Sequence, residues 1–245
     1  MEYNNMKKAF TLAEVLITLG VIGIIAAMTL PSLINYYKVK ELEVRFKKAD
    51  AIITQALLKT ANEAGYDSIS SFNIPGRTVT NENFAELKKQ VEVLNEFWLK
   101  QFTSADLLKS PYWNKACYSM MGGLVGEFYA GCYGYGTKLY QLQDGLVVGE
   151  LRAQNGGVYH PGQIVFFFDT NGIQNGPNRW GYDLFTFTSS EGYYKEWSCA
   201  PNSPDSNHDF YCYYYAHKNI NPAGKNKSYW DMLFKPLSYW QGRKF

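Results

Sequence analysis

The sequence predicts an α+β fold in which a long N-terminal amphipathic and transmembrane helix packs on an antiparallel β-sheet head domain. Three observations support this prediction: an uncharged apolar run at 15–34, a helical apolar period at 39–60, and a hairpin signal at Asp144-Gly145. The chain has 245 residues and a formal net charge of +2, so its charge gives no reason to expect a nucleic-acid partner.

The apolar run is the first predicted element. From Val15 to Ile34 no charged side chain occurs, and a helix of these about 20 residues can cross the ~30 Å hydrocarbon core of a bilayer. Lysines flank the run on both sides, so the positive-inside rule orients it only weakly, although the short leader is the easier end to leave in the cytoplasm. We therefore expect most of the chain outside the cytoplasm.

Glu14 is the unusual residue at the start of this run. A secretory signal has a shorter apolar region that ends at an A-x-A-like site, and Ala26-Ala27-Met28 matches such a site poorly. Neither a secretory signal nor a plain membrane anchor accounts for Glu14, because a carboxylate at the edge of a span costs up to a few kcal/mol unless it is paired or neutralised.

Residues 7–16, KKAFTLAEVL, resemble the processing site of type IV prepilins and of the pseudopilins of type II secretion. The resemblance implies that a prepilin peptidase, a membrane aspartyl protease, cuts between Ala9 and Phe10 and methylates the new amine. Ala9 departs from the family, in which the residue before the cut is usually glycine.

The resemblance also implies a division of the chain. Residues 1–9 would be a leader peptide, 10–35 a transmembrane and assembly helix, and 36–245 an extracytoplasmic pilin-like head that includes the outer half of the long helix. The protein would sit in the cytoplasmic membrane with a single span and then enter a pilus or pseudopilus. Its implied partners are the prepilin peptidase, other pilin or pseudopilin subunits and the inner-membrane assembly platform.

The implied function is that of a structural subunit rather than an enzyme. A soluble part larger than a bare shaft subunit needs favours a minor subunit. Two other functions stay open: an adhesive or DNA-capturing minor pilin, and a membrane-anchored extracytoplasmic enzyme that uses the same export signal.

Glu14 gains a partner if the chain is cut. Cleavage would leave a cationic amine on Phe10, four residues before Glu14 and on the same helix face. An amine and a carboxylate neutralise each other in a low-dielectric setting. The amine could belong to the same chain or to a neighbouring subunit; the resemblance favours the neighbour, and the pair would then set the axial register of assembly.

Glycine and proline interrupt the apolar helix at Gly20, Gly23 and Pro31. Glycine weakens a helix by ~1 kcal/mol and proline removes a backbone hydrogen bond, while small residues also suit close packing against another membrane helix. The resemblance implies that the stretch from Gly23 to Pro31 unwinds in an assembled filament.

Beyond Pro31 apolar residues recur at intervals of three and four, which predicts one long amphipathic helix that ends near Gly65. A second helix is predicted to open at Asn81 and Glu82. The period then becomes that of strands, and Asp144-Gly145 suits a tight hairpin turn. The predicted strands are Lys138–Gln143, Leu146–Arg152, Gln163–Phe168 and Asp183–Thr188.

Four cysteines lie between positions 117 and 212 of the chain. We predict sequential disulfides, Cys117 with Cys132 and Cys199 with Cys212, because an exported domain favours them and closing a loop of about 15 residues stabilises by ~3 kcal/mol. The other two connectivities stay open. Zinc is disfavoured, because neither pair has C-x-x-C spacing.

Residues 169–183 are predicted to form a loop between two strands. The side chains there that could supply part of a calcium site are Asp169, Asn171, Asn178 and Asp183. The loop is not an EF-hand, because its twelfth position is Trp180 rather than glutamate. Similar segments recur in pseudopilin-like proteins, some of which hold calcium there; the alternative is that these residues are ordinary turn formers. Calcium is thus the candidate cofactor.

No catalytic motif occurs, neither G-x-S-x-G nor H-E-x-x-H nor a glycine-rich phosphate loop. Cys199 with His208 or His217 is a conceivable nucleophile and base, but a disulfide for the cysteine and surface roles for the histidines, His160 included, are favoured. Near the C-terminus, Trp230, Tyr239 and Trp240 could form a sugar- or protein-binding surface, although we expect such aromatic residues to be mainly core.

Overall fold

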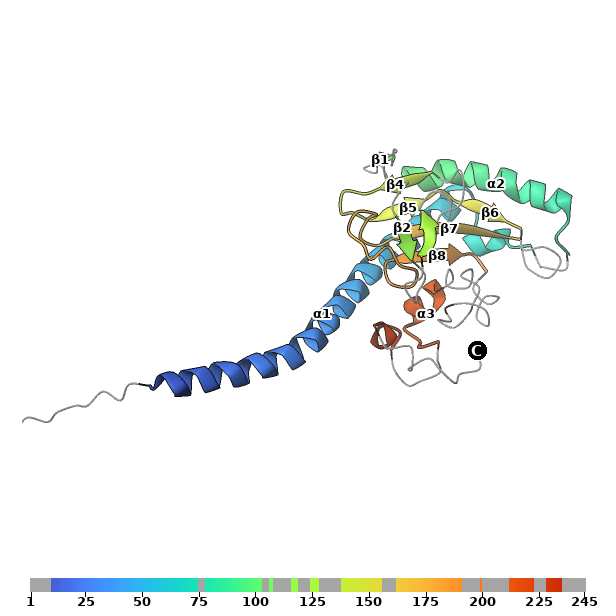
Figure 1. Ribbon diagram of the computed structural model, residues 1–245. Helices are drawn as coiled ribbons and strands as arrows, with labels where there is room; N and C mark the ends of the chain where they lie inside the picture. Colours follow the sequence, from blue (N-terminus) through green and yellow to red (C-terminus); the bar gives the residue numbers. More distant parts are fainter. Residues whose placement is uncertain are drawn as a thin grey trace, which may run out of the picture. The chain divides into compact units, whose positions relative to one another are not determined.

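The computed structural model describes residues 10–74, 78–102, 106–107, 138–155, 162–190, 199, 212–222 and 228–234, and the backbone of 116–118 and 124–127. The chain divides into two compact units, Met1–Glu41 and Leu42–Phe245, whose helices and strands are labelled in Figure 1. The predicted α+β class is confirmed, with a long N-terminal helix that is apolar in its first half and an antiparallel sheet.

Helix α1 runs from Leu12 to Glu63, so the apolar run and the amphipathic segment are one element, as predicted. Its end depends on Gly65, whose φ of 83° is a conformation that glycine adopts without strain. The Tyr66 N–H there donates to the Ala61 carbonyl at 2.9 Å, which satisfies a carbonyl that the last helical turn leaves open.

In the second unit α1 buries the stripe that the sequence predicts. The buried residues recur at intervals of mostly three and four, so they lie on one face of the helix. They are Leu42, Phe46, Ala49, Ile53, Ala56, Leu57, Thr60 and Ala61.

Helix α2, Asn81–Lys100, begins where the sequence predicts, at a reciprocal cap. Thr80 Oγ1 accepts the Asn83 N–H at 3.2 Å, and Asn83 Oδ1 accepts the Thr80 N–H at 2.7 Å. Two backbone donors that the first helical turn leaves open are thereby satisfied. A short 3-10 helix, η1 (Ile69–Phe72), precedes α2.

The main sheet is antiparallel, with the path β1-β4-β5-β7-β6 and with β8 paired to β7. Its strands are β1 (Asp106–Leu107), β4 (Leu139–Gln141), β5 (Val147–Gly149), β6 (Arg152–Gln154), β7 (Gln163–Asp169) and β8 (Leu184–Thr188). A separate pair joins β2 (Ala116–Tyr118) and β3 (Leu124–Glu127). The predicted hairpin is confirmed, since β4 and β5 pair on either side of Asp144-Gly145.

The predicted single strand Leu146–Arg152 is wrong, because this segment forms two strands, β5 and β6, that both pair with β7. Val148 lies opposite Phe168, and Arg152 lies opposite Val165. The segment from β5 to β6 therefore advances by four residues while β7 advances by three. The extra residue is a β-bulge, which alternation of side chains in the sequence does not reveal.

The backbone groups at this bulge bond to side chains of α2, which lies next to β6 in Figure 1. Asn95 accepts the Leu151 N–H at its Oδ1 and donates from its Nδ2 to the Leu151 carbonyl, each at 2.8 Å. Trp98 Nε1 donates to the Gly149 carbonyl at 3.1 Å. Side chains of α2 therefore replace the ladder bonds that the bulge removes.

One face of the sheet carries an aromatic core. Phe166 and Phe168 are two residues apart on β7 and point to that same face. Phe46 of α1 packs against Phe168 and Phe185, with ring centroids 6.3 and 4.7 Å apart. Trp98 of α2 lies 4.9 Å from Phe166, so α1 and α2 both cover this face.

Two short C-terminal helices, α3 (Tyr213–Lys218) and η7 (Trp230–Met232), add to the second unit. Tyr229 and Trp230 are fully buried, so the expectation that the C-terminal aromatic residues are mainly core is confirmed for these two. Tyr239 and Trp240 lie outside the described residues.

Candidate functional site

The N-terminal part of α1 exposes its apolar side chains. Residues 10–25 are exposed throughout, and Phe10 at the start retains 86% of its accessible surface. By length and composition, α1 contains the only candidate membrane span among the described residues. A continuous apolar helix surface of this kind is unfavourable in water and is stabilised by lipid or by other helices.

Glu14 caps the beginning of this helix. Its Oε2 accepts the backbone N–H of Thr11 at 2.9 Å and the Thr11 hydroxyl at 2.8 Å, while Thr11 Oγ1 accepts the Glu14 N–H at 3.3 Å. This reciprocal pair is a capping box, for which T-x-x-E in the sequence is the signature. The carboxylate thus lies at the N-terminus of the helix, in contact with Thr11, which directly follows Phe10.

Gly23 and Pro31 both lie inside the helix, which is continuous across them in the single chain. A Cβ added at Gly20 or Gly23 would meet no atom within 4 Å, so no contact within the described part of the chain requires either glycine. The expected unwinding concerns an assembled filament and stays a prediction.

The loop between β7 and β8 is organised by two fully buried carboxylates, Asp169 and Asp183. Asp169 Oδ1 accepts the N–H groups of Asn171 and Gly172 at 3.0 and 2.9 Å. Thr170 N–H donates to the Asp183 carbonyl at 2.9 Å, which joins the two ends of the loop. These are the backbone bonds that the turn-former alternative predicts.

Asp183 organises the second half of the loop in the same way. Its Oδ2 accepts the Asn178 N–H at 2.8 Å, and its Oδ1 accepts the Arg179 N–H at 2.6 Å. The structure therefore brings all four predicted site residues into one loop in which their backbone and side chains interact.

Four oxygen atoms of this loop are buried without a hydrogen-bond partner: Oδ2 of Asp169, Oγ1 of Thr170, Oδ1 of Asn171 and Oδ1 of Asn178. The amide nitrogens of both asparagines are engaged, since Asn171 Nδ2 donates to the Gly176 carbonyl at 2.6 Å and Asn178 Nδ2 to the Ile173 carbonyl at 2.9 Å. A buried acceptor without a donor costs ~1–3 kcal/mol. Carboxylate and amide oxygens are the ligands that Ca²⁺ prefers, so these residues fit the ion chemically.

The charge balance of the loop also favours a bound cation. Burial and the neighbouring Asp183 raise the pKa of Asp169 well above its usual value, while the Arg45 guanidinium acts in the opposite direction. Burial raises the pKa of Asp183 to about 6, although the hydrogen bonds that its carboxylate accepts from backbone N–H groups act to lower this pKa. The described residues contain no group of three or more His, Cys, Asp or Glu that could hold a metal, so a cation here would depend on amide and carbonyl oxygens.

The β4–β5 turn supports this loop from outside. Gly172 has a φ of 87°, and a Cβ added there would lie 2.8 Å from the Gly145 carbonyl. The turn itself is tied to α1, because Lys48 Nζ lies 2.8 Å from Asp144 Oδ2. The close approach explains why glycine occupies position 172.

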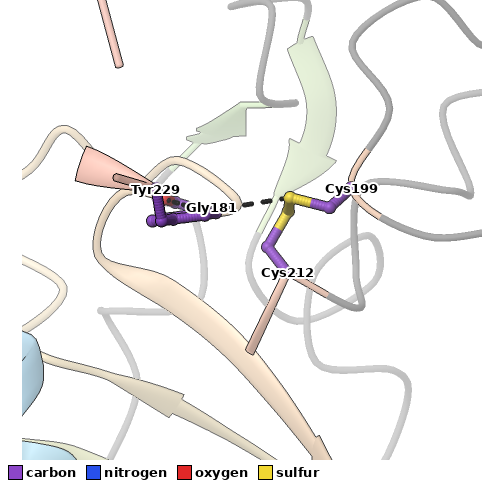
Figure 2. Close-up of a disulfide and its surroundings, with 4 residues drawn as sticks. All are labelled: Gly181, Cys199, Cys212 and Tyr229. Carbon is purple, nitrogen blue, oxygen red and sulfur yellow. Dashed lines mark hydrogen bonds between the residues drawn. A yellow bond between two sulfur atoms is a disulfide. The ribbon is translucent and has the colours of Figure 1, made fainter. Parts of the chain in front are cut away.

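Figure 2 shows the disulfide between Cys199 and Cys212, which confirms one of the two predicted pairs. Both cysteines are fully buried. Tyr229 lies beside them and donates its hydroxyl to the Gly181 carbonyl at 2.6 Å. Because the Cys199 sulfur is oxidised, the conceivable pairing of Cys199 with a histidine as nucleophile and base is wrong.

Several predicted site residues lie outside the described part of the chain. They are Ala9, Cys132, His160 and His208, and the side chain of Cys117 also falls outside. The second predicted disulfide therefore stays a prediction.

One side-chain cluster has no signal in the sequence. His217 Nδ1 lies 2.9 Å from Asp50 Oδ2, and the Tyr213 hydroxyl donates to Asp50 Oδ1 at 2.6 Å. Asp50 belongs to α1 and the other two residues to α3, so only the tertiary fold joins them.

Comparison with known proteins gives one finding, which concerns the N-terminus. Residues 4–30 match the family model of the prokaryotic N-terminal methylation motif. No curated protein and no solved structure matches the chain. The motif is the hallmark of type IV pilin and pseudopilin precursors, whose family is structural rather than catalytic. In its N-terminal segment the chain is therefore similar to type IV pilin and pseudopilin precursors, and the apolar helix that begins within the motif is long enough to cross a membrane.

Proposed function

We propose that this chain is a structural subunit of a type IV pilus or of a type II secretion pseudopilus. The observation that carries the proposal is the position of the methylation motif, which overlaps the start of the exposed apolar helix. The described part of the chain leaves that apolar surface exposed, and packing against the same helix of other subunits would cover it.

The proposed maturation begins with cleavage by a prepilin peptidase between Ala9 and Phe10. Residues 1–9 then leave as the leader, 10–35 remain as the membrane and assembly helix, and 36–245 form a head outside the cytoplasm. The inner-membrane assembly platform would receive the mature chain. A head of this size supports a minor position in the filament.

The geometry at the helix start supports a role for Glu14 in assembly. Its carboxylate already lies at the N-terminal end of α1, where it accepts hydrogen bonds from Thr11. Cleavage would create a cationic amine on Phe10, the residue directly before Thr11. We propose that this carboxylate pairs with the Phe10 amine of a neighbouring subunit and so fixes the axial register.

Intact mass and N-terminal sequencing test the processing step. The chain is to be recovered from cells with and without a prepilin peptidase. We expect a mature chain that begins with N-methylated Phe10 only in cells with the peptidase. A chain that still begins at Met1 in both would reject the proposal.

We also propose that the 169–183 loop holds Ca²⁺ as a structural ion of the head. The partnerless buried oxygens of Asp169, Asn171 and Asn178 and the two buried carboxylates support this. The ion would neutralise the carboxylates and satisfy those oxygens, and it would join the ends of β7 and β8 more firmly.

A further inference from the structure

We infer that the second unit contains a binding site for a neutral saccharide, at a pocket separate from the assembly helix and from the 169–183 loop. The pocket has a volume of about 630 Å³, which lies in the range of ligand sites in proteins. It lies where α1, the η1 loop, the end of β8 and α3 meet. The inference does not depend on filament assembly.

One wall of the pocket is aromatic. Phe187, Tyr213 and His217 line it, and the ring of Tyr213 lies 5.5 Å from the rings of both neighbours. The imidazole of His217 is stacked on Tyr213 with an angle of 27° between the planes. Flat rings of this kind offer contact area to the C–H face of a sugar ring at a low cost in side-chain entropy.

Most of the other residues that line the pocket are polar, and the apolar ones are Leu57, Leu58 and Ile69. Hydroxyl groups come from Thr54 and from four serines, an amide from Asn73 and the carboxylate from Asp67. The serines are Ser68, Ser70, Ser189 and Ser190. Hydroxyl and amide groups both donate and accept hydrogen bonds, which is what a ligand with many hydroxyl groups requires.

The composition of the pocket disfavours a phosphate-bearing ligand. None of the described residues that line it is a lysine or an arginine, the side chains that most often bind phosphate groups, and the carboxylate of Asp67 would repel a second anion. A saccharide suits both the aromatic and the polar residues of the pocket, because it has an apolar face and a rim of hydroxyl groups.

Partners around the pocket fix its polar side chains before a ligand arrives. Asp50 holds Nδ1 of His217 at 2.9 Å, which turns Nε2 away from Asp50. Asn73 Nδ2 donates to the Ser189 carbonyl at 3.0 Å, and Ser189 Oγ accepts the Ile164 N–H at 3.0 Å. Such preorganisation lowers the cost of ordering side chains on binding.

Saturation-transfer NMR on the full chain tests the inference, with cellobiose and N,N′-diacetylchitobiose as probes. The chain is kept in a zwitterionic amine-oxide detergent, because sugar-based detergents would compete. We expect saturation transfer to the ring protons of at least one disaccharide. Absence of transfer to both, or transfer that a short neutral peptide displaces completely, would overturn the inference.

Two neighbouring serines provide a matched pair of variants. Ser70 lines the pocket, whereas Ser71 is exposed in the same 3-10 helix and does not line it. We expect Ser70→Arg to fill the pocket and abolish saturation transfer, and Ser71→Arg, with the same added charge, to retain it. Because both positions are exposed, both variants are expected to fold. Equal transfer in the two variants would place the saccharide elsewhere and contradict the inference.

Discussion

Glu14 has two physical roles, and a substitution that removes its side chain would abolish both at once. As a cap, it satisfies backbone and hydroxyl donors of Thr11. As a charge, it offers a partner to an amine that exists only after cleavage. A glutamine can perform the first role but not the second, so the two roles can be separated by substitution.

We predict that Glu14→Gln permits cleavage but lowers incorporation into filaments at least ~tenfold, which corresponds to the loss of ~1.4 kcal/mol or more from a low-dielectric charge pair. Thr11→Ala, which weakens the cap but keeps the carboxylate, is expected to incorporate nearly normally. The measurement is the ratio of filament-bound to membrane-bound mature chain. Normal incorporation of Glu14→Gln would remove the charge role and leave only capping.

At the 169–183 loop, Asp169→Asn is the most informative substitution. Asparagine keeps an oxygen that can accept from Asn171 and Gly172, and its nitrogen replaces the partnerless Oδ2 without a negative charge. We expect Ca²⁺ at about 100 times its Kd to stabilise the parent chain by ~2.7 kcal/mol and the variant hardly at all. Thermal unfolding with Ca²⁺ and with chelator measures this, and Asp231→Asn, an exposed site, is the matched control. A Ca²⁺ response retained in Asp169→Asn would reject the site.

The same loop predicts how stability depends on pH in the presence of chelator. A carboxyl group whose pKa is raised on folding binds more protons in the folded state than in the unfolded state. Its contribution to the free energy of unfolding is therefore fully present below the unfolded pKa of ~4. That contribution is lost as the pH rises through the pKa of the folded state. For Asp183 that value is about 6. The stabilisation by Ca²⁺ should therefore be larger at neutral pH than at pH ~5.

Among the elements, the β5–β6 bulge and α2 depend on each other. The bulge leaves Leu151 without ladder partners, and Asn95 supplies both a donor and an acceptor at 2.8 Å. Leu151 is almost fully buried, so water does not replace Asn95 readily. The position of α2 on the sheet is therefore fixed by polar groups as well as by the Trp98 side chain.

We predict that Asn95→Ala destabilises the folded chain by ~1–3 kcal/mol, because it leaves a buried N–H and a buried carbonyl unpaired. The gain in helix propensity from asparagine to alanine, below ~1 kcal/mol, offsets only part of this loss. Urea unfolding followed by circular dichroism measures it. Asn62→Ala, at an exposed site near the end of α1, carries the same propensity change and is expected to be neutral or slightly stabilising. Equal effects of the two variants would contradict the anchoring role.

At the scale of the whole molecule, the Cys199–Cys212 disulfide closes a loop that ends at the start of α3. We predict that replacing both cysteines by alanine costs ~3 kcal/mol, as expected for a closed loop of about 15 residues. The fall in the denaturant midpoint measures this. An unchanged midpoint would show that the buried Tyr229 and Trp230 side chains suffice to order the region.

The sequence by itself determined the fold class and the N-terminal methylation motif. The apolar run, Phe10 and Glu14 are read from neighbouring positions, and the helix stripe, the caps and the Asp144-Gly145 turn depend on local periods and local bonds. The T-x-x-E signature of the cap at Thr11 is also a local pattern, although the sequence-based interpretation considers only the charge of Glu14 and not its role as a cap.

Only the tertiary structure decided the rest, because it depends on contacts between residues far apart in the chain. The β-bulge is an offset of one residue in the pairing with β7, which no pattern within β5 or β6 encodes. The burial of Asp169 and Asp183, and with it the pKa shift of both, follows from elements packed around their loop. The pocket and the contact of Asp50 with His217 join α1 to α3 across more than 160 residues, a distance over which local sequence patterns carry no information.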